Sequence, residues 1–207
     1  MNAQALDFLT RNYAAGRICL VGLTDAMYEL IRIGQAKITK DGKPSKWNHT
    51  FLMGDRRGSP GKQTIYILES DIHFSWKKFS FVNGPQESPL DKWCKDTIEH
   101  ACVLGMELTP PDQQKAIGKG LEIAYDERYK YPVGELFGTL WAMLTNTLHK
   151  RNIFDEKYAI QCATFVRMCY QAIGKDPLVT STDDLSNTSP ERIWQSPGWT
   201  FRAEWSR

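Results

Sequence analysis

The chain has 207 residues, of which 42% are hydrophobic and 12% aromatic, and this composition predicts a folded domain with a substantial core. Its 26 basic and 24 acidic side chains give a formal net charge of +2 without any polybasic block, which argues against a nucleic acid or an anionic membrane surface as the partner. No stretch approaches the roughly 20 apolar residues that a membrane-spanning helix needs, so we expect no membrane span.

The cellular compartment is predicted from the N-terminal segment and the cysteines. Residues 1–17 lack the basic region and the apolar segment that together mark a secretory signal. The cysteines are an odd number without the spacing of a disulfide framework: Cys19, Cys94, Cys102, Cys162 and Cys169. We therefore expect a cytoplasmic protein, and export by a machine that needs no cleaved signal is the alternative.

Strand and turn signals dominate the first 84 residues. The expected elements are, in chain order, a helix over 5–15, a strand over 17–23, a helix over 24–38 and strands over 47–55, 64–70 and 77–84. The loop that joins the second and third of these strands contains Gly58, Pro60 and Gly61, which is typical of a hairpin connection.

The helical period dominates the rest of the chain. The expected elements are helices over 88–106, 110–126, 134–150 and 161–174, and a short capped helix within 188–199. Strands that come first and helices that follow predict the α+β fold class.

Cys162 is the first candidate for catalysis. It shares a helical stripe with Phe165 and Cys169, at i+3 and i+7, and such a cysteine is most often a small core residue. The alternative is a catalytic role, because unpaired N–H groups and the helix dipole stabilise a thiolate in the first turn of a helix. We expect this helix to begin near Gln161, since a start at Asp155 would bury Cys162 two turns inside it.

A thiolate nucleophile needs a base and a group that orients the base. His49 lies in the strand predicted over 47–55, where strict alternation would place it on the same face as Trp47 and Phe51. Glu69 ends an apolar run in the paired strand, and cross-strand neighbours lie about 5 Å apart. The alternatives are a hydrogen-bonded core histidine and a strand-end glutamate that reaches solvent.

Five segments occur in a characteristic order: GRICL (16–20), SKWNHTFLMGD (45–55), IYILES (65–70), YAIQCATFVRMCYQAIG (158–174) and TSPERIWQSPGW (188–199). In this order they resemble the YiiX-like, circularly permuted branch of the NlpC-type (papain-like) cysteine peptidases and amidases. The resemblance implies a permuted papain-like fold in a single domain over 1–207, with a small antiparallel sheet packed against helices and a mainly helical insertion over 84–150. It also implies that Cys162 is the nucleophile, His49 the base and Glu69 the orienting carboxylate.

The resemblance extends to the surroundings of the site. YDERYKY (125–131) is similar to the family's Tyr-Asp segment, so Tyr125 is expected to line the site, and Trp47 is expected to border the substrate beside His49. Arg17 stands where the family usually has aspartate, which implies a different anchoring of the first strand or an adaptation to an acidic substrate group. Asn48 and Ala163 stand where serine is usual.

The implied function is that of a thiol hydrolase that cleaves an amide bond in a small peptide or a peptidoglycan-type substrate through a thioester, without a cofactor or a metal. Two alternatives keep the fold: a lipid acyl hydrolase or acyltransferase, as in the lecithin:retinol acyltransferase group, and a non-catalytic binding module. Cys94, His100 and Cys102 lack the spacing of a zinc site and are expected on an amphipathic helix. The sequence leaves the substrate and the oligomeric state open.

Overall fold

The computed structural model describes residues 1–75, 80–126, 128–129, 145, 147, 160–178 and 184–207. Its strands are β1 (Ile18–Leu23), β2 (His49–Arg57), β3 (Thr64–Ser75), β4 (Ser80–Pro89), β5 (Ile98–Gly105) and β6 (Phe201–Ser206). Its helices are α1 (Ala3–Arg11), α2 (Ala26–Gly34), α3 (Pro110–Ala124), α5 (Cys162–Gln171) and α6 (Pro190–Gln195), with 3-10 turns η1 (Gln35–Lys37), η2 (Leu90–Trp93) and η3 (Leu185–Asn187). The expected α+β class is confirmed.

Among the described residues the strands form one antiparallel sheet in the order β4-β3-β2-β1-β5-β6. The strand β1 lies inside the sheet between β2 and β5, and all six of its residues are buried. A strand that is covered on both faces reads as a continuous apolar run, which is why ICLVGL identifies it.

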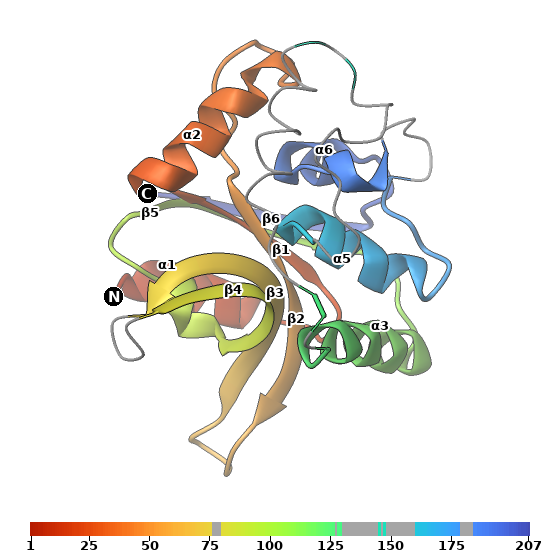
Figure 1. Cartoon of the computed structure of the whole chain (residues 1–207). Coiled ribbons are helices and arrows are strands. Elements are labelled where there is room, and N and C mark those ends of the chain that lie inside the picture. The colour runs from red at the N-terminus through yellow and green to blue at the C-terminus, as the bar shows by residue number, and fades with distance from the viewer. Residues whose placement is uncertain (76–79, 127, 130–144, 146, 148–159, 179–183) are drawn as a thin grey trace.

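Two apolar layers cover the sheet. On one face, residues of α3, α5 and α6 pack with Ile18, Leu20 and Leu104 in one core cluster. On the other face, residues of α1 and η2 pack with Val21 and Phe51 in a second cluster. Figure 1 shows α3 and α5 on one side of the sheet and α1 on the other. None of the described helices is both long and apolar enough to cross a membrane.

Immediately before β2, the side-chain amide of Asn48 makes the two hydrogen bonds to Leu23 that a neighbouring strand would otherwise make. The amide of Asn48 accepts a hydrogen bond from the backbone N–H of Leu23 at 3.2 Å and donates one to the Leu23 carbonyl at 2.7 Å. Gly22, which precedes Leu23 in β1, has no room for a side chain, because a Cβ there would lie 2.0 Å from the carbonyl oxygen of Lys46. These contacts fix the backbone immediately before His49.

The prediction of a helix over 88–106 is wrong. The segment forms the short turn η2 and the strand β5, which pairs with β1 on one side and β6 on the other. The residues Ala101–Gly105 are all buried, and a short continuous apolar run does not distinguish a buried strand from a buried helix. The expected insertion over 84–150 is therefore corrected, because its first part belongs to the sheet and α3 is the only α-helix among its described residues.

Most of the other expected elements are confirmed. The strand over 17–23, the hairpin of β2 and β3, and the helices over 110–126, 161–174 and 188–199 all form, with ends that differ by a few residues. The helix expected over 134–150 lies outside the described residues, apart from positions 145 and 147. The strand β6 was not expected from the sequence.

Candidate active site

Cys162 occupies the first position of α5. The residue before it, Gln161, has the extended dihedral angles φ −75° and ψ 161°, and the first helical hydrogen bond runs from the Phe165 N–H to the Gln161 carbonyl at 2.8 Å. The expectation that the helix begins near Gln161 is confirmed. The Cys162 N–H is therefore among the amides that have no partner within the helix, and these amides favour a thiolate at this position.

The structure brings His49 and Glu69 together. Met53 in β2 and Ile67 in β3 are cross-strand partners, so their side chains are on one face of the sheet. His49 and Glu69 lie an even number of residues from these partners, and they are therefore on that face too. The His49 Nε2 atom is 2.9 Å from Glu69 Oε2, and the two residues are 2% and 0% exposed. Because an ionised carboxylate can only accept, Nε2 carries the proton of this hydrogen bond, and Nδ1 is left to face another group.

The imidazole of His49 also interacts with the side chain of Cys162. Burial alone would lower the pKa of His49, but the charge of Cys162, a hydrogen bond between the two side chains, and Glu69 together raise it to about 10. This arrangement favours the protonated form of the imidazole. Cys162 is itself 5% exposed, so the thiol and the base share a nearly closed environment.

Glu69 is held by two further donors. The Trp93 indole N–H donates to Oε2 at 2.6 Å, and the Lys92 ammonium donates to Oε1 at 2.6 Å. Burial would raise the pKa of Glu69, but the hydrogen bond from His49 and the charge of Lys92 outweigh it, so the pKa is lowered. The indole of Trp93 also lies against the imidazole of His49, with ring centroids 4.2 Å apart and the planes tilted by 30°. The carboxylate and the imidazole are thus fixed in charge and in orientation.

Four residues of this network were not identified from the sequence. They are Tyr28, Asp71, Lys92 and Trp93. Lys92 and Trp93 lie in the segment that was predicted as a helix, so their position beside β3 could not be foreseen. Asp71 carried a usable signal, because it stands two residues after Glu69 and alternation places both carboxylates on one face of the strand.

The expectation that Trp47 shares a face with His49 is wrong, whereas its expected place beside the substrate stays a prediction. Trp47 is 1% exposed and packs in the core cluster on the α5 side, with its ring centroid 6.3 Å from that of Trp194. His49 instead contacts the rings of Phe51 and Trp93, which belong to the cluster on the opposite face. The chain reaches Trp47 before β2 begins, so strand alternation does not extend to it.

Tyr125 lies at the C-terminal end of α3, where it is 72% exposed. Among the described residues, the structure gives its side chain no hydrogen bond or ring contact with Cys162, His49 or Glu69. Its expected role in lining the site stays a prediction.

Arg17 lies at the far end of β1 from the candidate site. Val21 is the residue of β1 that pairs with His49, and Arg17 lies four positions before Val21 along the chain, roughly 13 Å away. The Arg17 guanidinium donates to the Asn12 carbonyl at 2.8 Å and stacks on the ring of Phe201 at 3.6 Å. These contacts favour the anchoring interpretation over an acidic substrate group at Cys162.

No group of three or more His, Cys, Asp or Glu side chains within the described part of the chain could hold a metal ion. Cys94, His100 and Cys102, expected on a helix, lie instead at the end of η2 and on β5. Both cysteines are buried.

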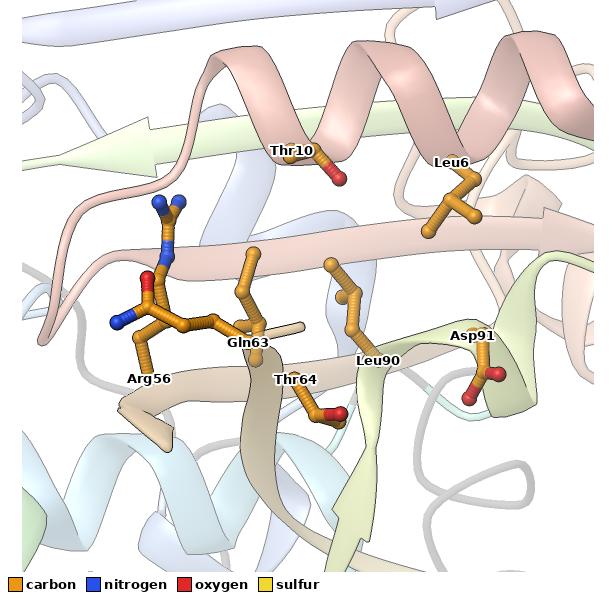
Figure 2. Close-up of a pocket in the computed structure, with 8 residues that line it drawn as sticks. Leu6, Thr10, Arg56, Gln63, Thr64, Leu90 and Asp91 are labelled. Atoms are coloured by element: carbon orange, nitrogen blue, oxygen red, sulfur yellow. The ribbon is translucent and has the colours of Figure 1, made fainter. Parts of the chain in front are cut away.

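A pocket of about 270 Å³ lies between α1, the β2–β3 hairpin and η2. Figure 2 shows Leu6 and Thr10 above it and Arg56, Thr64 and Asp91 along its other edges. Cys162, His49 and Glu69 do not line it. It is therefore separate from the candidate active site.

No protein-family model matches this chain, and no curated protein matches it either. The geometry of Cys162, His49 and Glu69 is therefore the basis for inferring a function.

Proposed function

We propose that the chain is a permuted papain-like thiol hydrolase that cleaves an amide bond in a small peptide or a peptidoglycan-type substrate. The observation that carries this proposal is the position of Cys162 at the start of α5, electrostatically coupled to a buried imidazole that Glu69 orients. A core cysteine requires neither the helix terminus nor a buried acid and base beside it.

The order of the elements supports the permuted arrangement. The strands that supply the base and its orienting carboxylate, β2 and β3, precede the cysteine helix α5 in the chain. The helix α5 packs on the sheet in a core cluster that contains both Cys162 and Leu52 of β2. The support for a base presented from the sheet to the start of α5 is the charge and the hydrogen bond by which Cys162 acts on His49, the first residue of β2.

The reaction follows from these positions. His49 takes the proton of Cys162, and the thiolate attacks the carbonyl carbon of the substrate. The N–H of Cys162 stabilises the oxyanion, and the C–N bond breaks as His49 returns its proton to the leaving amine. A water molecule then attacks the thioester with His49 as base, which releases the acid and restores the thiol.

Two measurements test this function. The first is the intact mass of the protein after reaction with short peptides that carry a vinyl sulfone electrophile, with Cys162→Ala as the negative control and Cys102→Ala as the matched control. The second is the hydrolysis of a panel of small peptide amides compared with a panel of acyl esters. We expect an adduct on Cys162 and cleavage of amides, both lost in Cys162→Ala and kept in Cys102→Ala.

Other outcomes contradict the proposal in distinct ways. Turnover of esters alone would indicate acyl chemistry at the same thiol. The absence of both an adduct and turnover in the folded wild type would leave a binding module.

A further inference from the structure

A partly buried lysine lies beside the orienting carboxylate. Lys92 in η2 places its ammonium 2.6 Å from Glu69 Oε1 and 2.9 Å from Asp71 Oδ2. The side chains of Lys92, Glu69 and Asp71 are 18%, 0% and 3% exposed. Buried charges are tolerated only when they are paired, so this ammonium balances two carboxylates at once.

The other titratable groups around Glu69 come from several elements. His49 approaches from β2, and Cys162 from α5 acts on His49. Tyr28 from α2 donates its hydroxyl to Asp71 Oδ1 at 3.0 Å. Lys95 lies over the ring of Trp93, 5.3 Å from its centroid. The cross-strand partner of Glu69 on β4 is Gln86, which does not titrate.

The consequence of losing the ammonium follows from charge alone. Glu69 and Asp71 stand two residues apart on one face of β3, and two neighbouring buried carboxylates raise each other's affinity for a proton. If Glu69 takes that proton, it no longer offers a negative charge to the imidazolium of His49. The thiolate of Cys162 then loses the cation that stabilises it.

We infer that Lys92 is a positioning residue that keeps Glu69 ionised beside Asp71, so that His49 can hold the proton of Cys162. This inference rests on the proposed Cys162–His49 site, and it identifies Lys92 as the group that keeps the carboxylate of Glu69 charged there. Lys92 acts through Glu69 and does not touch the thiol.

The test measures the rate at which iodoacetamide alkylates Cys162 as a function of pH, by peptide mapping, in the full chain. The variants are Lys92→Met, Lys92→Arg and the double variant Asp71→Asn/Lys92→Met. In Lys92→Met we expect the acid limb of the profile to move to higher pH by at least about one unit. Lys92→Arg keeps the cation and should follow the wild-type profile.

The double variant separates charge from structure. It removes one negative and one positive charge together, so the net charge of the cluster is that of the wild type, and the amide oxygen introduced by Asp71→Asn can still accept from Tyr28. We expect its acid limb to return at least halfway to the wild-type position. If Lys92 only filled space, neutralising Asp71 would not compensate for the loss of the lysine, and the acid limb would not return.

The outcomes are distinguishable. A wild-type Cys162 that is no more reactive at acidic pH than the other cysteines would overturn the proposed function, and this inference with it. A reactive wild type with an unchanged profile in Lys92→Met, or equal shifts in the single and double variants, would overturn the inference alone. If Lys92→Met does not fold by circular dichroism, the comparison of Lys92→Arg with the double variant decides, and a raised acid limb in a folded double variant counts against Lys92.

Discussion

At the scale of single residues, the imidazole of His49 is set between two unlike groups. Its Nε2 atom faces the fully buried carboxylate of Glu69, which leaves Nδ1 as the nitrogen that can serve Cys162. The hydrogen bond to Glu69 selects the tautomer with the proton on Nε2, so the neutral ring presents a lone pair at Nδ1. The neutral ring is the state that acts as the general base when water attacks the thioester, whereas the raised pKa of His49 favours the protonated ring beside Cys162 before the reaction.

The first prediction concerns the relative reactivity of the cysteines. We expect iodoacetamide at mildly acidic pH to alkylate Cys162 before the other four. Burial raises the pKa of Cys19 and Cys169, and it raises the pKa of Cys94 and Cys102 to about 12. Peptide mapping of a time course measures the order, and earlier modification of Cys94 or Cys102 would count against a reactive thiol at the start of α5.

The second prediction concerns turnover in Glu69→Gln. The substitution keeps the shape of the side chain but removes the charge that favours the imidazolium, so we expect kcat/KM to fall by at least about tenfold. More activity should remain than in Cys162→Ala, which lacks the nucleophile. Glu122→Gln on the exposed surface of α3 is the matched control and should behave as the wild type. Full activity in Glu69→Gln would remove Glu69 from the mechanism.

The third prediction concerns stability at acidic pH. A carboxyl group with a lowered pKa in the folded state stabilises the protein above its unfolded pKa, here 4.5, and this contribution is lost as the pH falls through the folded value. The difference in free energy of unfolding between the wild type and Glu69→Gln should therefore be largest near neutral pH and shrink below pH 4.5. Urea unfolding at a series of pH values measures it. A difference that stayed constant into acid would contradict an ionised Glu69.

The sequence was sufficient to select Cys162, His49 and Glu69, and the geometry brings these three together. Each has a local signal, namely a cysteine before an amphipathic run, a histidine inside an apolar strand and a carboxylate at the end of another. Each signal alone also fits a core or surface residue, and the resemblance of the five ordered segments selected the three together. Lys92 lacked such a signal, because a lysine beside a tryptophan is ordinary on a surface helix. Its role depends on a turn whose position against β3 follows only from the folded chain.

At the scale of elements, the candidate site depends on how two elements begin. The helix α5 begins at Cys162 because Gln161 is extended, and the strand β2 begins at His49 because Asn48 pairs with the backbone of Leu23. The first start was predicted from the need of a reactive thiol for the unpaired N–H groups of a first turn, although Gln161 makes no side-chain cap. The second could not be predicted, since an asparagine side chain that replaces a strand neighbour has no sequence period. This is also why the expected face of Trp47 was wrong.

The fourth prediction concerns Gly22, beside the entry to β2. Gly22→Ala places a Cβ 2.0 Å from the carbonyl oxygen of Lys46, and a backbone atom there cannot move aside as a flexible side chain would. We expect the free energy of unfolding to fall by at least about 2 kcal/mol. The matched control is Gly118→Ala in α3, where no atom lies within 4 Å of the added Cβ. The control should gain about 0.5–1 kcal/mol from improved helix propensity.

Chemical denaturation of both variants distinguishes a local clash from a general glycine effect. Equal changes in the two variants would contradict the close approach of Lys46. A destabilised Gly22→Ala that also loses reactivity at Cys162 would show that the entry to β2 positions His49.

At the scale of the whole molecule, the C-terminal part of the chain completes structures that the N-terminal part begins. The strand β6 extends the sheet beside β5, and α6 meets the segment between α2 and β2. Such long-range pairings carry little local signal, so β6 was not expected although the helix α6 was. The α+β class was predicted correctly although β5 and β6 lie in the half of the chain that was expected to be helical, but the order of the strands within the sheet could not be predicted.

The buried contacts between these two parts converge on Gln35. Its amide donates to the Trp47 carbonyl at 2.6 Å and accepts from the N–H of Glu191 at 2.9 Å, and the residue is 0% exposed. The Glu191 carboxylate in turn accepts from the Ser45 hydroxyl at 2.6 Å. One side chain therefore ties α6 to the segment that leads into His49.

The last prediction follows from this arrangement. Gln35→Met keeps the length of the side chain but leaves the Trp47 carbonyl and the Glu191 N–H without this partner in a buried place. Because each unsatisfied buried group costs about 1–3 kcal/mol, we expect the free energy of unfolding to fall by about 2–4 kcal/mol. Gln114→Met on the exposed face of α3 is the matched control and should change it by less than about 0.5 kcal/mol. Urea unfolding of both variants measures the difference, and equal stabilities would show that α6 docks without Gln35. If Gln35 also positions β2, Cys162 in the folded Gln35→Met protein should be alkylated more slowly. The substitution removes the hydrogen bond from Gln35 to the Trp47 carbonyl, which fixes the segment before His49.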